Sequence, residues 1–309
     1  MYWRWSRCSH DSGKIRFVKV KGVQRIIMSI KRIMVIGGGT MGLGIAQAAA
    51  QNGFEVLLKD INLEVAEKGK QKIEDTLKRI LNKGKIVEQE MNSTLHNIEC
   101  IANFKKVNRP DFIIESVSED INIKKAVLKE VDQFYDSDVR IASNTTSLSI
   151  TDLSSVIRKS KNFIGMHFFN PVWAMKLVEI TSGLSTSKET IEATKDLVQL
   201  LGKIPVVAME SPGGITSRIL GAMLNEAIFA LAEGIASAEN IDIAMKLGAN
   251  LPIGPLHLVD IIGLDIHLAK METLYKEFGD PKYRPHPLLR KMIRAGYLGK
   301  KSGKGFFSY

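Results

Sequence analysis

The sequence predicts two domains, an α/β domain built on a parallel sheet and an all-α domain that follows it. The chain has 309 residues, and domains typically have roughly 100–200 residues, so two domains are expected. Up to about residue 211, short β-branched runs alternate with longer stretches of helical periodicity, which is typical of βαβ units. From Pro212 onward only helical patterns remain.

Short apolar runs predict the strands of the first domain, and the helical stretches between them supply the crossovers of a parallel sheet. The expected strands are Arg32–Ile36, Phe54–Leu58, Asp111–Glu115 and Val139–Ser143. The expected helices are Met41–Gln51, Asn62–Lys83 and Ile121–Phe134. Two further strand-like runs, Asn162–Phe169 and Lys176–Thr181, are too close in sequence for a crossover helix, so we expect a hairpin-like return there.

A Ser-Pro-Gly-Gly stretch, Ser211–Gly214, marks the predicted boundary between the domains, which are 28–211 and 212–309. The stretch Ile215–Ala236 carries small and apolar residues on all sides, which predicts a buried helix. Pro and Gly residues separate the remaining expected helices, Ile241–Leu247, Gly263–Phe278 and His286–Ala295.

The first 27 residues differ from the rest of the chain. They hold seven Lys/Arg against one acid and two of the three tryptophans, and they lack the apolar core of a secretory signal. An organellar presequence has such a basic, acid-poor composition. We favour a second interpretation, in which Met28 is the natural start and residues 1–27 are a disordered or non-native extension.

Composition excludes several classes of protein. The net charge is +10, but residues 1–27 carry +6 of it, and the remaining +4 is too mild for a nucleic-acid-binding protein while it suits an anionic small ligand. No apolar run is long enough for a transmembrane helix. The only cysteines, Cys8 and Cys100, favour a reducing compartment such as the cytoplasm. No H-x-x-x-H or H-E-x-x-H pattern is present, so we expect no metal.

A glycine motif predicts a dinucleotide site. The segment Gly37-Gly38-Gly39-Thr40-Met41-Gly42 matches G-x-G-x-x-G, directly after a predicted strand and before a predicted helix. In this pattern Gly37 permits a tight turn, Gly39 lets a pyrophosphate approach the backbone at the helix N-terminus, and Gly42 permits close helix–strand packing. Asp60 ends the next strand, where its carboxylate would bind a ribose 2′-hydroxyl and repel a 2′-phosphate. The first domain is therefore expected to be a Rossmann-type NAD-binding domain.

One histidine stands in a pattern that suits acid–base chemistry. His167 ends a strand-like run, and Glu179 lies 12 residues later on the neighbouring run. If the two runs pair, the carboxylate can fix the imidazole tautomer and stabilise its protonated form. The spacing alone is equally compatible with a histidine that only packs.

Five segments carry a resemblance to a known family: VIGGGTMGLGIAQAAA, ASNTTSLSIT, IGMHFFNPVWAMKLVEI, LAEGIASAENIDIAMKLGANLPIGPL and KYRPHPLLRKMIRAGYLGKKSGKGF. From about Met28 to Tyr309 the chain resembles the 3-hydroxyacyl-CoA dehydrogenases, most closely their bacterial 3-hydroxybutyryl-CoA branch. The resemblance implies a Rossmann-type domain that binds NAD, an all-α C-terminal dimerisation domain that gives a homodimer, and a role in fatty acid metabolism.

Roles for individual residues follow from the same resemblance. His167 would be the general acid/base and Glu179 would orient it. The cofactor would be held by the residues of the glycine motif (Gly37, Gly39, Thr40, Met41, Gly42) and by Asp60, Glu119, Lys124, Asn170 and Lys301. Thr76 and Lys83 would contact coenzyme A, and the basic composition of Asn62–Lys85 suits its phosphates.

The chain departs from the family pattern at four positions. Thr146 stands where the family has an active-site serine, and Thr76 stands where it has a serine at the CoA site, so each position keeps a hydroxyl. Ser217 replaces an active-site asparagine, and Gly214 replaces a phenylalanine. Losing an electrostatic contact to a developing oxyanion costs roughly 2.7–4 kcal/mol, so we expect turnover to be reduced or retuned.

The leading hypothesis is therefore reversible NAD-dependent oxidation of short-chain (3S)-3-hydroxyacyl-CoA, such as 3-hydroxybutyryl-CoA, to 3-oxoacyl-CoA, such as acetoacetyl-CoA. Two alternatives stay open. One keeps the chemistry but uses longer or dicarboxylic acyl-CoA. The other is a catalytically weakened protein that binds NAD and CoA.

Overall fold

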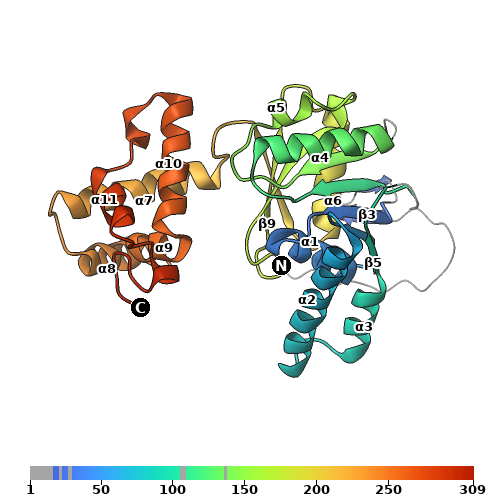
Figure 1. The fold of residues 1–309 in the computed structure, drawn as a ribbon, viewed down its shortest axis with the longest axis horizontal. Coiled ribbons are helices and arrows are strands. Elements are labelled where there is room, and N and C mark those ends of the chain that lie inside the picture. The colour runs from blue at the N-terminus through green and yellow to red at the C-terminus, as the bar shows by residue number, and fades with distance from the viewer. Residues whose placement is uncertain (1–16, 21–22, 27–29, 105–108, 136–137) are drawn as a thin grey trace. The chain divides into compact units, whose positions relative to one another are not determined.

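The computed structural model of the chain describes residues 17–20, 23–26, 30–104, 109–135 and 138–309 (Figure 1). The described chain forms two compact units. The first contains the residues up to Asn144 together with Val156–Ile180 and Ser185–Val206. The second contains Thr145–Ser155, Thr181–Leu184 and Val207–Tyr309.

An eight-stranded sheet organises the first unit, in the order β10-β9-β8-β7-β6-β3-β4-β5. Its strands are β3 (Arg32–Ile36), β4 (Glu55–Lys59), β5 (Ile98–Ile101), β6 (Phe112–Glu115), β7 (Arg140–Ser143), β8 (Phe163–Phe168), β9 (Leu177–Ser182) and β10 (Ile204–Met209). From β5 across to β8 every neighbouring pair is parallel. The central strands β3, β6 and β8 are buried because helices cover the sheet, as parallel sheets require.

The strand order reverses between β3 and β6. From β3 the chain moves outward through β4 and β5, then returns to β6 on the other side of β3 and continues to β7 and β8. Open α/β sheets bind their ligands at the carboxyl ends of the strands beside such a reversal. The glycine motif directly follows β3, so it lies at that point of the sheet.

The last two strands, β9 and β10, run opposite to the strands before them. The connection between β8 and β9 is shorter than the dozen residues a parallel crossover needs, so these neighbouring strands run antiparallel. Between β9 and β10, Ile204 N donates to Lys176 O and Glu210 N donates to Ser182 O, a constant offset that makes this pair parallel. The predicted hairpin-like return between Asn162–Phe169 and Lys176–Thr181 is confirmed.

Helices join the strands and are capped by local side chains. They are α1 (Thr40–Gln51), α2 (Leu63–Asn82), α3 (Glu88–His96), α4 (Ile121–Phe134) and α6 (Lys188–Leu200). Asn62, Asp120 and Ser187 accept backbone N–H groups at the starts of α2, α4 and α6. Helices α2 and α3 lie side by side (Figure 1).

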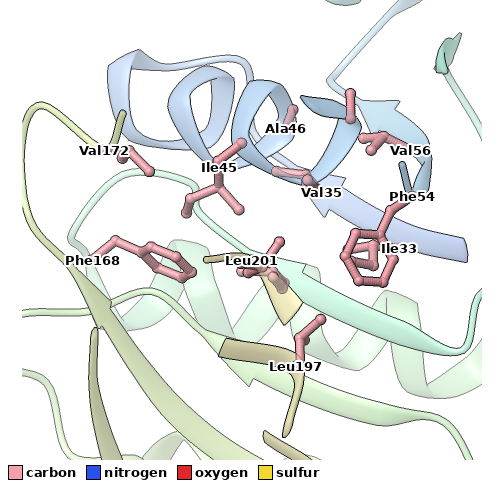
Figure 2. Close-up of a cluster of buried hydrophobic side chains, with 14 of the residues drawn as sticks. Ile33, Val35, Ile45, Ala46, Phe54, Val56, Phe168, Val172, Leu197 and Leu201 are labelled. Atoms are coloured by element: carbon pink, nitrogen blue, oxygen red, sulfur yellow. The ribbon is translucent and has the colours of Figure 1, made fainter. Parts of the chain in front are cut away.

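The core of the first unit lies between α1, α6 and the sheet. It includes Ile33 and Val35 of β3, Ile45 and Ala46 of α1, and Leu197 of α6. Figure 2 shows Phe168, the last residue of β8, and Val172 in the same cluster. Phe168, directly after His167, and Val172, two residues after Asn170, are therefore anchored in the core.

The second unit is built mainly from helices. They are α5 (Ile150–Ser154), α7 (Thr216–Ala232), α8 (Ala238–Gly248), α9 (Pro255–Ile262), α10 (Leu264–Phe278) and α11 (Pro287–Arg294), with short 3₁₀ turns at Pro281–Tyr283 and Lys300–Ser302; a third turn, Ser160–Asn162, lies in the first unit. The apolar core joins α7, α9 and α10 through Leu224, Leu256 and Leu264. The buried Asp260 accepts from the backbone N–H groups of Phe306 and Phe307 and so holds the C-terminal residues.

Strands β1 (Phe17–Val20) and β2 (Val23–Ile26) form a separate antiparallel pair. The rest of residues 1–27 lies outside the described residues, and so do Cys8 and the predicted start Met28. Among the helices that the structure describes, none combines the length and the apolar character needed to cross a membrane.

The predicted fold class is confirmed, with differences in individual elements. The sequence reasoning missed α3, β5, α5, α6, β10 and α9. The predicted helix from Ile215 ends at Ala232 because Gly234, two residues beyond, adopts a positive φ of 74°. The helix predicted from Ile241 begins at Ala238 because Ser237 caps it.

The buried His267 of α10 makes the stability of the second unit depend on pH. Its side chain is fully buried, and neither ring nitrogen has a hydrogen-bond partner among the described residues. Burial, with a smaller effect of Lys270, lowers the pKa of His267 from 6.5 to about 4. This part of the stability is therefore complete above pH 6.5 and is lost as the pH falls toward 4, by about 3 kcal/mol. We expect His267→Leu to remove this loss.

The check is the free energy of unfolding in urea at pH 7, 5.5 and 4, compared between wild type and His267→Leu. The exposed His96→Leu serves as the matched control, because it makes the same substitution at a position outside the core. An equal difference between wild type and His267→Leu at pH 7 and pH 4 would contradict the prediction.

Candidate active site

The glycine loop after β3 is shaped by contacts within the protein. Gly37 has a φ of 109°, and its N–H donates to Lys59 O at 2.8 Å. A Cβ on Gly37 would lie 2.5 Å from Ser116 O, and a Cβ on Gly42 would lie 1.9 Å from Gly37 O. These two positions need glycine even before a ligand binds.

Gly39 needs glycine for no such reason. A Cβ there would meet nothing within 4 Å, and Gly39 forms the N-cap of α1 without a side-chain cap. Thr40 and Met41 form the first turn of the same helix, which contains no acidic residue. The backbone N–H groups at this helix start are therefore available to an anion, and the helix dipole favours one. This open, uncapped helix start fits the diphosphate of NAD.

Asp60 follows β4 and reaches back over the glycine loop. Its Oδ2 accepts from Gly38 N at 2.5 Å and its Oδ1 accepts from Ile61 N at 2.7 Å. The half-buried carboxylate keeps acceptor capacity for ribose hydroxyls and its charge disfavours a 2′-phosphate. Lys59 is buried with its Nζ 4.7 Å from the centre of the Phe104 ring. The position and charge of the Asp60 carboxylate therefore fit NAD.

His167 and Glu179 meet across β8 and β9, as their spacing predicts. His167 Nδ1 lies 3.1 Å from Glu179 Oε2, and the two side chains are 12% and 3% exposed. The ring of Phe169 packs on the imidazole, with 4.2 Å between ring centres. The carboxylate can hold the proton on Nδ1, which leaves Nε2 as the nitrogen for proton exchange.

The loop after β8 carries Asn170 and is held from two sides. Asn170 is exposed and precedes Pro171 through a cis peptide bond. The buried Lys203 donates from Nζ to Val172 O at 2.5 Å and to Met175 O at 2.8 Å. On the other side, a Cβ on Gly44 of α1 would lie 2.9 Å from Val172. The loop therefore rests against α1 at Gly44, two residues after the glycine motif ends.

A buried ion pair underlies the carboxyl ends of β6 and β7. Lys124 of α4 and Glu115 of β6 are both 0% exposed, with Lys124 Nζ 2.8 Å from Glu115 Oε1. Lys124 Nζ also donates to Asn144 O at 3.0 Å and to Val117 O at 3.4 Å. Ser143 donates to the other oxygen of Glu115 at 2.5 Å. Burial raises the pKa of Glu115, and Lys124 opposes that rise.

The burial of Lys124 argues against a direct contact between its ammonium and the cofactor. All three N–H groups of its ammonium have acceptors within the protein, so a ligand could reach one only by displacing an acceptor. The 40% exposed Glu119, whose Oε2 lies 3.7 Å from Lys124 Nζ, is the accessible member of this group. A helical spacing with the buried Leu128 and Val131 already marks Lys124 as an inward position.

The expected CoA-contacting residues share one helix. Thr76 lies on α2 and Lys83 forms its C-cap, seven residues on, so both lie on one face about 10 Å apart along the axis. Lys83 is exposed, and Thr76 donates to Lys72 O within the helix. Thr76 Oγ1 also accepts from Arg79 at 3.3 Å.

The other predicted site residues belong to the second unit. Thr146 is exposed in the loop after β7, and Ser217 is buried in the first turn of α7. Gly214, two residues before α7, has a φ of 54°. Lys301 is exposed and pairs with Asp265 at 2.6 Å, which lowers the pKa of that carboxyl.

Sequence reasoning missed Glu115, Asn144 and Lys203. Each directly ends, follows or precedes a strand, which is the signal that could have marked them, but nothing local reveals their partners. Asn144 bonds to Phe168, and Lys203 bonds to Val172.

Comparisons with known proteins cover both units. The family model described as 3-hydroxyacyl-CoA dehydrogenase, NAD binding domain, matches residues 32–211, and the one described as 3-hydroxyacyl-CoA dehydrogenase, C-terminal domain, matches residues 213–309. A probable 3-hydroxybutyryl-CoA dehydrogenase of Bacillus subtilis is 46% identical over 282 residues, covering 91% of this chain and 98% of the relative. The human mitochondrial hydroxyacyl-coenzyme A dehydrogenase is 38% identical and covers 91% of each.

A solved structure agrees. The crystal structure of an (S)-3-hydroxybutyryl-CoA dehydrogenase from Ralstonia eutropha superimposes with a TM-score of 0.88 at 47% identity, covering 91% of this chain and 99% of that one.

The two kinds of glycine in the motif should behave differently on substitution. Gly42→Ala places a Cβ against Gly37 O, so we expect the free energy of unfolding to fall by about 1–3 kcal/mol or more. Gly39→Ala has room and an ordinary φ of −75°, so we expect a stability change below about 1 kcal/mol. Its Cβ lies where the diphosphate would approach, so NADH affinity should fall about tenfold or more. Urea unfolding and NADH fluorescence titration measure the two effects.

Lys124 provides a second test. Lys124→Met leaves Glu115 buried without its cation, so we expect a loss of about 3–5 kcal/mol in unfolding free energy at pH 7. The lone carboxyl then has a still higher pKa in the folded state. The loss should therefore shrink as the pH falls from 7 toward 4.5, because the carboxyl becomes protonated in the folded variant and no unpaired charge stays buried. The exposed Lys129→Met on the same helix is the control, and equal stability of the two variants would refute the structural role of the pair.

Proposed function

The chain belongs to the 3-hydroxyacyl-CoA dehydrogenase family and is an NAD-dependent oxidoreductase, and on that premise we propose that its substrate is 3-hydroxybutyryl-CoA. The reaction is the reversible oxidation of the (3S)-hydroxyl group, with acetoacetyl-CoA as product. The observation that carries the proposal is the 3.1 Å contact between His167 Nδ1 and Glu179 Oε2.

The proton transfer is assigned to His167. The bound NAD would supply the hydride acceptor for C3 of the substrate in oxidation, and its reduced form the hydride donor in the reverse direction. In oxidation, Nε2 takes the proton of the 3-hydroxyl, and the carboxylate of Glu179 stabilises the resulting imidazolium. In reduction the same nitrogen gives the proton back. Phe169, packed on the imidazole, limits its rotation and covers one of its faces.

The cofactor and substrate contacts follow the features described above. The helix start at Gly39, Thr40 and Met41 would hold the diphosphate, and Asp60 would hold the ribose. We assign the exposed Glu119, Asn170 and Lys301 to the cofactor as well, and Thr146 to the substrate. Thr76 and Lys83, on one face of α2, would bind the phosphates of coenzyme A.

We also propose that the enzyme is a cytoplasmic homodimer. Large apolar side chains are exposed on α7 to α10 of the second unit, among them Ile219, Ile243, Leu247 and Ile266. Such a set is typical of a subunit interface. The free thiol Cys100 supports a reducing compartment.

We expect wild type to oxidise NADH with acetoacetyl-CoA, and His167→Ala to reduce kcat by about 10²–10⁴-fold, because it removes the acid–base group. Glu179→Gln keeps the size but removes the charge, so its kcat should fall by about tenfold or more with little change in KM. The exposed His96→Ala should match wild type. NADH absorbance measures the rates, and NADH fluorescence shows whether each variant still binds the cofactor.

The alternatives give different results in the same assay. Higher kcat/KM with longer or dicarboxylic 3-oxoacyl-CoA would move the substrate class and keep the chemistry. Binding of NADH and CoA without turnover on any acyl-CoA would refute the enzymatic role of the His167 pair. Activity that appears only in Ser217→Asn would identify a weakened site, since that change restores the family's amide.

A further inference from the structure

Asn144 connects four segments of the first unit at the carboxyl edge of the sheet. Its N–H donates to Glu115 O at 2.7 Å, and its C=O accepts from Lys124 Nζ at 3.0 Å. Its side-chain Nδ2 donates to Ser116 Oγ at 3.0 Å, and its Oδ1 accepts from Phe168 N at 3.2 Å. The four hydrogen-bonding groups of Asn144 therefore have partners on three other elements: the end of β6, α4 and β8.

The bond to Phe168 reaches the peptide unit next to His167. In the parallel ladder between β7 and β8, the last paired residues are Ser143 and Gly165. Beyond that pair, the Asn144 side chain continues the link between the two strands. The peptide N–H that it holds is joined to the carbonyl carbon of His167, so the bond fixes the backbone torsion that aims the imidazole.

The buried ion pair holds Asn144 in turn. Lys124 binds both the Glu115 carboxylate and the Asn144 carbonyl, so it ties the ends of β6 and β7 to α4. These groups are desolvated, which makes their hydrogen bonds strong and their geometry narrow. Glu179 of β9 holds the imidazole of His167. The side chain of Asn144, directly after β7, holds the main chain next to His167 through Phe168 N.

We propose that Asn144 is a positioning residue for proton transfer, acting through the Phe168 peptide on His167, with the Glu115–Lys124 pair as its support. Its side chain fixes the direction of the imidazole relative to Glu179. This inference rests on the proposed role of His167 and extends it to a residue outside the resemblance-based site.

The test compares variants that remove different bonds of Asn144. Asn144→Ala loses both side-chain bonds, whereas Ser116→Ala removes only the bond from Nδ2 and keeps the one to Phe168. We expect Asn144→Ala to lower kcat by about ten- to hundredfold, with NADH affinity changed less than threefold, since misplacement by about 1 Å can cost 10²-fold. Ser116→Ala should stay within about threefold of wild type.

A spectroscopic readout separates positioning from stability. Long-range ¹H–¹⁵N spectra of histidine-labelled protein, with His167 assigned by its loss in His167→Ala, report which ring nitrogen carries the proton. We expect Nδ1–H in wild type and in Ser116→Ala, and a mixture of tautomers in Asn144→Ala. If Asn144→Ala does not fold, Asn144→Asp, which keeps an acceptor for Phe168, is compared with Asn144→Leu, which does not.

Two results would overturn the proposal: wild-type kcat in Asn144→Ala, or an unchanged His167 tautomer in every folded variant that lacks the Phe168 acceptor. Loss of stability with unchanged kcat would assign Asn144 a structural role only. The proposed function and the positioning role of Asn144 can fail independently. Absence of turnover in wild type would contradict the proposed function, and the His167 tautomer in the variants would still test whether Asn144 positions the imidazole.

Discussion

Parallel pairing of β3, β6, β7 and β8 is the constraint on which the site depends. Because these strands run in one direction, the residues that follow them gather at one edge of the sheet. The glycine loop, Glu115, Asn144 and His167 come from segments spread along more than a hundred residues, yet the sheet brings them to that edge. The reversal of strand order between β3 and β6 opens this edge to a ligand.

Placing so many strand ends together leaves buried carbonyls and N–H groups that need partners. Buried charges supply them: Lys124 serves the loops after β6 and β7, and Lys203 serves the loop after β8. A lysine in such surroundings costs desolvation, and burial accordingly lowers the pKa of Lys203. That cost is offset by fixing three loops that main-chain pairing alone leaves free.

The sequence could predict features that depend on local patterns. Periodicity located α1 and α4 to within a residue or two, and spacing alone brought His167 and Glu179 together across a short return. It could not locate β10, because Pro205 argues against a strand and is tolerated only at a sheet edge, where β10 lies. Nor could it reveal Asn144, whose partner Phe168 is 24 residues away and is chosen by strand register.

In the proposed function, the carboxylate of Asp60 has two roles. It faces the position expected for the ribose, and it also holds the loop through Gly38 N and Ile61 N. Coenzyme preference and the geometry of the glycine loop therefore depend on the same side chain in this chain. A redesign toward a 2′-phosphorylated coenzyme that simply neutralises Asp60 would release the loop it anchors, so new donors for the phosphate must be introduced together with a replacement acceptor for those two amides.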